Sequence, residues 1–78
     1  MTMRKVKDIC AGGVITGDAF FINAENVVRI DFQQLSDRKI HAVAKEQTTI
    51  GPRYYALEVG PYSSIQEAEK NFAADSRF

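Results

Sequence analysis

The sequence has little of what marks disulfide-rich, metal-binding and membrane proteins. Its 78 residues include one cysteine, Cys10, one histidine and no tryptophan. A single thiol cannot form an intramolecular disulfide, and one cysteine with one histidine is too few for a zinc site. No apolar run approaches the roughly 18 residues of a membrane-spanning helix, and the basic N-terminus is not followed by the apolar stretch of a signal peptide. We therefore expect a cytoplasmic protein without a metal, a cofactor or a membrane segment.

The chain also lacks an excess of charge of either sign. Ten Lys and Arg side chains balance ten Asp and Glu side chains. This balance argues against a dedicated duplex-DNA binder, which carries a basic patch, and equally against an acidic DNA mimic. Hydrophobic residues make up 45% and charged residues 26%, values typical of a globular domain. The length allows one small domain over residues 1–78 with a thin core.

Alternating apolar residues between turn signals predict an antiparallel sheet. The Gly17-Asp18 pair is typical of a tight turn, and Gly12-Gly13 of a bulge or turn. One face of the sheet is expected to carry Val28, Ile30 and Phe32, then Ile40, Ala42 and Ala44, then Tyr55, Leu57 and Val59. The predicted strands cover residues 3–11, 19–22, 27–32, 39–46 and 54–59, with residues 14–16 continuing or restarting the first.

A C-terminal helix is predicted from residue 64 onward. Ser64, followed three residues later by Glu67, forms the capping box that opens a helix. The apolar residues of the expected helix follow one stripe at helical spacing: Ile65, Ala68, Phe72 and Ala73. The predicted fold is therefore α+β, an antiparallel meander of four to five strands with one C-terminal helix packed on the sheet.

One helix is too short to cover both faces of such a sheet. A helix of about 12 residues spans about 18 Å, so a second, outer face is left over. A contiguous apolar patch on a small protein usually marks a partner surface, and we expect a protein partner there or a second copy of the chain in a homodimer. In the alternative arrangement, the meander curls into a half-open barrel and itself buries the apolar side chains of this outer face. The predicted partner-binding residues are Phe21, Arg29, His41, Val43 and Tyr54.

The same face supports binding of single-stranded nucleic acid as an alternative function. Outward cations beside exposed aromatic rings form platforms on which bases stack. The residues for this alternative are Arg29, Lys45, Arg53 and Tyr54. The neutral net charge favours the protein partner over the nucleic acid.

No residue pattern predicts an enzyme. Nucleophilic catalysis would need Cys10 activated by His41, with Asp31 or Asp37 orienting the imidazole. These residue types are present, but no local signature of a catalytic site surrounds them. We expect Cys10 and His41 to be ordinary strand residues and the protein to be non-enzymatic.

The stretch from Phe20 to Asp31, FFINAENVVRID, resembles the core of the FlbD/SwrD-type family of small motility regulators. It reads as an aromatic and aliphatic strand, an Asn-Ala pair and a second alternating strand. The likeness extends in outline over residues 6–74, including the last predicted strand and the helix. It implies a small cytoplasmic, non-enzymatic regulator without catalytic residues. Small phage and plasmid proteins share such a pattern, so a regulator of a host machine and a phage- or plasmid-encoded inhibitor both stay open.

Overall fold

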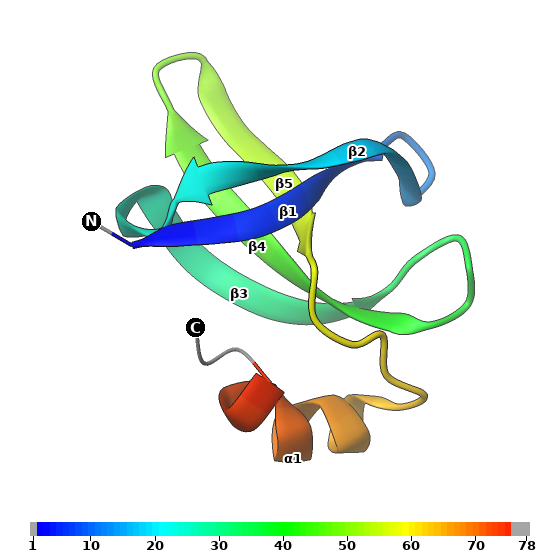
Figure 1. Ribbon diagram of the computed structural model, residues 1–78. Helices are drawn as coiled ribbons and strands as arrows, with labels where there is room; N and C mark the ends of the chain where they lie inside the picture. Colours follow the sequence, from blue (N-terminus) through cyan, green and yellow to red (C-terminus); the bar gives the residue numbers. More distant parts are fainter. Residues whose placement is uncertain (1, 76–78) are drawn as a thin grey trace.

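The computed structural model describes residues 2–75, which form one five-stranded antiparallel sheet and one α-helix (Figure 1). The predicted α+β class, with the helix at the C-terminal end of the chain, is confirmed. The elements in chain order are β1 (Met3–Cys10), β2 (Val14–Asn23), a 3-10 helix η1 (Ala24–Asn26), β3 (Val27–Gln34), β4 (Ile40–Thr48), β5 (Gly51–Leu57) and α1 (Ile65–Asp75).

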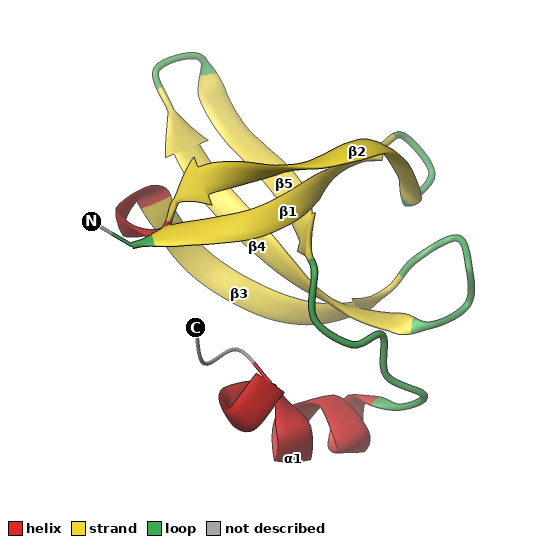
Figure 2. Cartoon of the chain, viewed as in Figure 1, coloured by secondary structure: helices red, strands yellow, loops and turns green. Residues whose placement is uncertain are grey.

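The strand order in the sheet is β2-β1-β5-β4-β3. It consists of the β1–β2 hairpin and the consecutive strands β3 to β5, joined where β1 pairs with β5. The two edge strands, β2 and β3, follow each other in sequence and are linked only by η1. The sheet must therefore curl to bring these strand ends together, and Figure 2 shows β1 and β2 crossing over β4 and β5. This is the curvature expected of the alternative arrangement, in which the meander curls into a half-open barrel.

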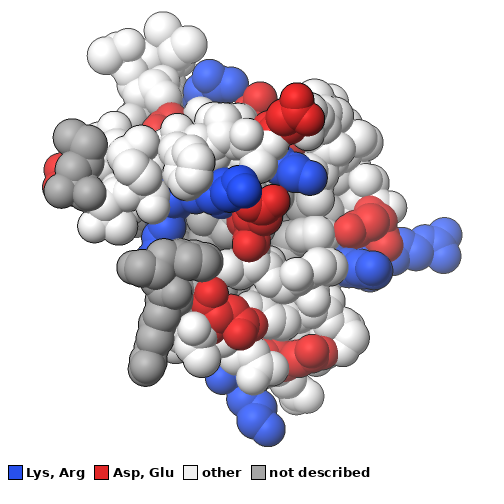
Figure 3. Space-filling model, in the orientation of Figure 1, with Lys and Arg blue, Asp and Glu red and all other residues white. Residues whose placement is uncertain are grey.

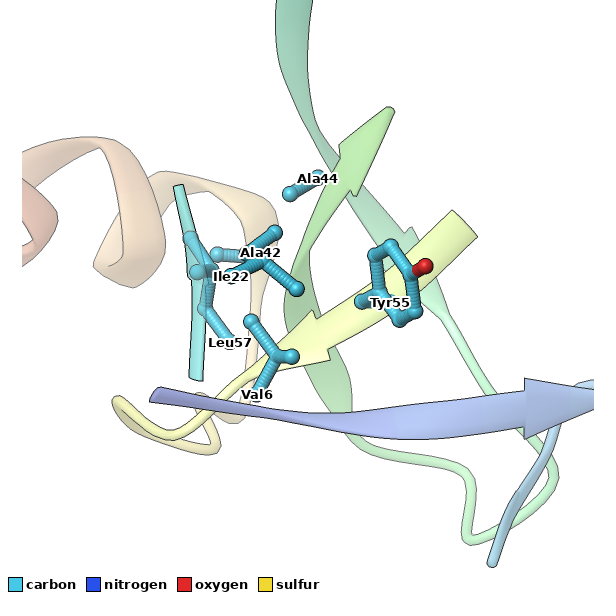
Figure 4. Close-up of a cluster of buried hydrophobic side chains, with 6 residues drawn as sticks. All are labelled: Val6, Ile22, Ala42, Ala44, Tyr55 and Leu57. Atoms are coloured by element: carbon cyan, nitrogen blue, oxygen red, sulfur yellow. The ribbon is translucent and has the colours of Figure 1, made fainter. Parts of the chain in front are cut away.

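The curled sheet encloses the main core on what we call its inner face. Six buried residues from four strands form this core and point toward one another (Figure 4). Partly buried side chains pack around them from β2, β3 and α1, among them Phe20, Ile30 and Phe72. The ring of Phe20 meets that of Tyr55 edge-on, with 5.5 Å between ring centroids. The six core residues are Val6, Ile22, Ala42, Ala44, Tyr55 and Leu57.

The helix begins as its sequence predicts. The Glu67 N–H donates to the Ser64 hydroxyl at 3.1 Å, so Ser64 is the N-terminal cap. The Glu67 carboxylate accepts hydrogen bonds from the backbone N–H and the hydroxyl of Ser63. These bonds hold the pKa of Glu67 below its ordinary value. The two ends of the capping box are therefore both satisfied, although the acidic side chain bonds Ser63 rather than the cap itself.

Two of the four residues predicted for the apolar stripe hold the helix on the sheet. Ala68 is buried beside Ile40 and Tyr62, and the ring of Phe72 meets that of Phe32 edge-on at 5.4 Å. Ile65, in contrast, is 47% exposed, and Ala73 is also exposed. The predicted stripe was too wide, because this short helix contacts the sheet mainly along β3 and β4. Tyr62 adds a polar anchor, since its hydroxyl donates to Asp75 Oδ2 at 2.7 Å.

The observed strands differ from the predicted ones at two bulges. The Gly17-Asp18 turn is wrong, because β2 runs continuously through it and the chain reverses at residues 11–13 instead. The pairing shifts between Val6 and Asp8 of β1, and Gly17 has a φ of 75° in the bulged segment of β2. A second shift occurs in β3 between Val27 and Arg29. It leaves Val28 exposed, whereas the prediction placed this side chain with the core residues of β3.

Candidate functional site

The outer face of the sheet is partly covered by a second, smaller hydrophobic cluster. Leu35, Val43 and Ala56 are buried there, with Ile9 and Ile15 packed against them. Val43 is only 3% exposed, so its predicted position on an open partner surface is wrong. The cause is the curvature of the chain, which places the far end of the β1–β2 hairpin over β4 and β5.

The loop between β3 and β4 is bound to the hairpin over this cluster. The Ser36 N–H donates to the carbonyl of Gly13, in the turn between β1 and β2, at 3.0 Å. Within the loop, the Leu35 N–H donates to the Lys39 carbonyl and the Arg38 N–H to the Leu35 carbonyl. Two segments far apart in sequence therefore meet and close part of the outer face.

His41 is also buried, which corrects its predicted exposure. Its side chain is only 8% exposed, and Nε2 lies 2.7 Å from Asp37 Oδ2 in the same loop. The other carboxylate oxygen of Asp37 accepts the Lys39 N–H at 3.0 Å. The hydrogen bond from Lys39, followed by that of His41, holds the pKa of Asp37 below its ordinary value. His41 is therefore positioned to fasten the loop to β4 rather than to contact a partner.

An outer groove of about 500 Å³ remains beside the cluster. One of its walls comes from the β1–β2 turn and the other from β3, and Tyr54 of β5 stands at its side. Tyr54 is 44% exposed, in agreement with its predicted outward position. The residues that line the outer groove are Ile9, Cys10, Ala11, Gly13, Arg29, Gln33, Leu35, Val43 and Tyr54. Three of the five predicted partner-binding residues thus meet in one place.

A row of three side chains crosses the strands at one end of the groove. Arg29 of β3 pairs in register with Lys45 of β4, which pairs with Tyr54 of β5. Directly opposed residues in an antiparallel sheet point to the same face, so this row lies on the outer face. Arg29 Nε lies 2.8 Å from Asp31 Oδ2, so its charge is compensated. Lys45 is half-buried and makes no ion pair with any other residue of the described range 2–75.

Arg53 does not join this row, contrary to the nucleic-acid alternative. It precedes Tyr54 in β5, and successive strand residues point to opposite faces. Its guanidinium lies 3.6 Å from Asp8 Oδ1 and stands over the Tyr55 ring at 5.5 Å from the centroid. The structure therefore gathers three of the four predicted nucleic-acid residues and separates the fourth.

Phe21 is exposed as predicted but lies apart from the outer groove. It stands on the edge strand β2, 61% exposed, opposite Lys5 of β1. Lys5 Nζ is 3.2 Å from Glu58 Oε2. Phe21 lines a separate hollow of about 190 Å³ together with Met3, Arg4, Lys5, Leu57, Glu58 and Val59. The predicted partner-binding set is thus divided between the outer groove, the buried loop anchor and this edge.

The structure does not bring Cys10 and His41 together as a catalytic pair. Cys10 is exposed, and its Sγ lies 3.3 Å from Thr16 Oγ1, whereas His41 is bonded to Asp37. Within residues 2–75 no three His, Cys, Asp or Glu side chains cluster in a way that could hold a metal ion. The one α-helix of this range is also too short and too polar to cross a membrane.

Comparisons of the chain with protein-family models, with curated proteins and with solved structures find no match. Function therefore has to be inferred from the groove and the side chains around it. Sequence reasoning missed the contribution of Ile9, Cys10 and Leu35 to this groove. One signal was present, because Ile9 and Ile15 lie three residues on either side of Gly12 and so pair across the hairpin.

Proposed function

We propose that this protein is a small, non-enzymatic interaction module that binds another protein through the outer groove. The observation that carries the proposal is the meeting of Arg29, Val43 and Tyr54 in one recess with an apolar floor. Tyrosine and arginine beside a desolvated apolar centre are the residue types that dominate the energy of protein interfaces. Tyr54 offers its ring at the side of the groove, and Val43 forms part of the floor.

The resemblance of residues 20–31 to small motility regulators supports such a role. The single cysteine suits a reducing compartment, so we place the module in the cytoplasm. A host regulator and a phage- or plasmid-encoded inhibitor would use the same surface. The identity of the captured partner distinguishes these two roles.

Affinity capture with matched variants tests the proposal. Tagged wild-type protein, Tyr54→Ala and Ile65→Ala are incubated with native host extract, with and without nuclease. Tyr54 and Ile65 are similarly exposed, but Ile65 lies on α1, away from the groove. We expect a nuclease-resistant partner that Tyr54→Ala loses and Ile65→Ala retains, with unchanged circular dichroism for both variants. Equal capture by both variants would exclude the outer groove as the interface.

We propose homodimerisation as a use of a different surface, the edge strand β2. An edge strand offers unpaired backbone groups to a second chain, and Phe21 adds an exposed aromatic ring there. Light scattering should give the mass of a dimer for the wild type. Phe21→Lys should give a monomer, because a charge at this edge opposes pairing. A monomeric wild type would remove the dimer and leave the groove proposal unchanged.

The row of Arg29, Lys45 and Tyr54 favours single-stranded nucleic acid as the second candidate function. Against it, the ten Lys and Arg side chains are balanced by ten Asp and Glu side chains, and the two signs are intermixed on the side of the molecule drawn in Figure 3. Binding of an oligo-dT strand that weakens steeply with salt would support this candidate. Arg53→Ala serves as the control, because Arg53 lies on the other face, whereas Arg29→Ala should reduce the binding.

A further inference from the structure

The outer groove has a mixed chemistry that narrows the choice of occupant. Its floor is apolar, since Leu35 and Val43 are buried and Ile9 packs against them. Its volume of about 500 Å³ lies inside the range of roughly 300–1,000 Å³ that is typical of ligand sites in proteins. It can therefore accept an apolar side chain together with part of the backbone that carries it.

The wall formed by β3 favours an extended occupant. β3 is an edge strand, and beyond its bulge it pairs regularly with β4 from Arg29 to Gln34. The groove lies over the outward side chains of Arg29 and Gln33, and the free edge of β3, on the side away from β4, borders it with backbone donors and acceptors that have no partner strand within residues 2–75. An extended segment can satisfy these groups by strand addition, whereas a helix has its own backbone groups occupied.

The charge at the end of the groove favours an acidic group on that segment. Arg29 is already paired with Asp31, whereas Lys45, between Arg29 and Tyr54, has no carboxylate partner within residues 2–75. Because Lys45 is half-buried, its charge is less well screened than that of a fully exposed lysine. The unpaired Lys45 therefore favours a bound segment that carries one carboxylate.

The same features disfavour a nucleic-acid strand in this groove. Single strands are bound by a track of cations along the phosphates and by several aromatic rings on which bases stack. The groove has Tyr54 as its aromatic ring above an apolar floor, and Lys45 lies just beyond its lining, in register between Arg29 and Tyr54, as a cation without a carboxylate partner within residues 2–75. This chemistry matches a peptide better than a polyphosphate.

We infer that the outer groove binds an extended peptide segment that carries an aliphatic side chain and, one to three residues away, an aspartate or glutamate. The aliphatic side chain packs on Leu35 and Val43 beside Tyr54, and the carboxylate pairs with Lys45. This inference rests on the proposed function, because it names the chemistry of the partner at the same site.

Synthetic peptides test this chemistry directly. The probes are fluorescein-labelled eight-residue peptides of Gly and Ser that contain one Leu and, one to three residues later, one Asp. In the matched set Asn replaces Asp. An exposed or half-exposed ion pair contributes up to about 1 kcal/mol, so the best Asp peptide should bind about fivefold more tightly than its Asn counterpart. Fluorescence anisotropy gives the dissociation constants.

Two lysine variants and the alkylation of Cys10 show whether the peptide binds in the outer groove. Lys45→Met keeps the apolar stem and should abolish the difference between the Asp and Asn peptides. Lys70→Met, on the exposed side of α1, should preserve it. Cys10 lines the groove and is the only cysteine of the chain, so bound peptide should slow its alkylation by iodoacetamide. Slower alkylation that depends on the Asp peptide concentration reports occupancy of the groove itself.

The outcomes separate this inference from the proposed function. Equal affinity for Asp and Asn peptides, or no binding and no protection of Cys10, overturns the acidic segment. If Tyr54→Ala still loses the captured protein, the groove remains the interface and only the chemistry of the partner is wrong. Protection of Cys10 by oligo-dT in place of the peptides would assign the groove to nucleic acid and overturn both.

Discussion

The two faces of this sheet are built from the same strands but are closed in different ways. On the inner face, apolar contacts close the sheet. Six buried residues meet there, and Phe72 of α1 packs over Phe32. On the outer face, three buried residues are covered by a hairpin end and a loop, which polar bonds hold in place. Alternation along the strands gives one continuous apolar face, and the few apolar residues of the other face are covered only as far as the hairpin end and the loop reach. The outer groove is what these loops leave open.

Two leucine truncations should give the largest difference in stability between the two faces. Leu57→Ala removes a buried side chain from the inner core and should lower the free energy of unfolding by about 4 kcal/mol. Leu35→Ala removes one from the outer cluster and should cost about 2 kcal/mol, because the loop around it can relax into the space. Urea unfolding of both variants, followed by circular dichroism, measures the difference. Equal costs, or a larger cost at Leu35, would show that the outer cluster is as rigid as the core.

The sequence was a good guide to the inner face and a poor one to the outer face. Ile40, Ala42 and Ala44 alternate through β4, and all three predicted inward residues of this strand are buried. Alternation alone then places His41 and Val43 outward, and they do point outward. They are buried all the same, because residues 9–15 and the β3–β4 loop lie over them. Burial by distant segments leaves no local signal in the sequence.

Bulges account for the remaining errors at the strands. Val28 alternates with Ile30 in the sequence, but the shift before Arg29 removes it from the inner face. In the candidate site, Arg29 and Tyr54 could be assigned from their strand positions. The contribution of Cys10 could not, because it depends on how far the β1–β2 hairpin bends over the sheet.

The helix provides the second test of how the inner face is closed. Phe72→Ala should lower the free energy of unfolding by about 3 kcal/mol, the low end for a phenylalanine, because the side chain is only half-buried. Ile65→Ala, on the same helix but exposed, should change it by less than about 0.5 kcal/mol. Thermal and urea unfolding of the pair measure both values. If Phe72→Ala costs no more than Ile65→Ala, α1 does not cover the inner core.

The hydrogen bond between Tyr62 and Asp75, which anchors α1, should make a smaller contribution to the free energy of unfolding, and this contribution depends on pH. Burial and the hydrogen bond to Asp75 raise the pKa of Tyr62 to about 12. Because the folded value lies above the unfolded one, near 10, this contribution is complete below pH 10 and is lost as the pH rises toward 12. Tyr62→Phe should cost about 1.5 kcal/mol at pH 7 and weaken the loss of stability between pH 10 and 12. An unchanged alkaline profile in this variant would contradict the anchor.

Asp37 in the β3–β4 loop should make the smallest contribution to stability, and this contribution is lost at acid pH. The Lys39 N–H and His41 hold the folded pKa of Asp37 below its ordinary value of 3.8. The ionised carboxylate therefore stabilises the fold above about pH 4, and this contribution is lost as the pH falls through the lowered folded value. Asp37→Asn should shift the urea midpoint only slightly at pH 7 and should flatten its decline below pH 4.

Glu67→Gln is the matched control, because Glu67 also has a lowered pKa but accepts hydrogen bonds from Ser63 at the start of α1, away from the loop. Amide NMR spectra recorded from pH 5 to pH 2 should distinguish the two carboxylates. Protonation of Asp37 should move the Gly13 and Ser36 signals, since the loop that it fastens bonds the β1–β2 turn. These shifts should be absent in Asp37→Asn and present in Glu67→Gln. Identical acid shifts in both variants would mean that the outer cover is held by its apolar cluster alone, as the inner face is.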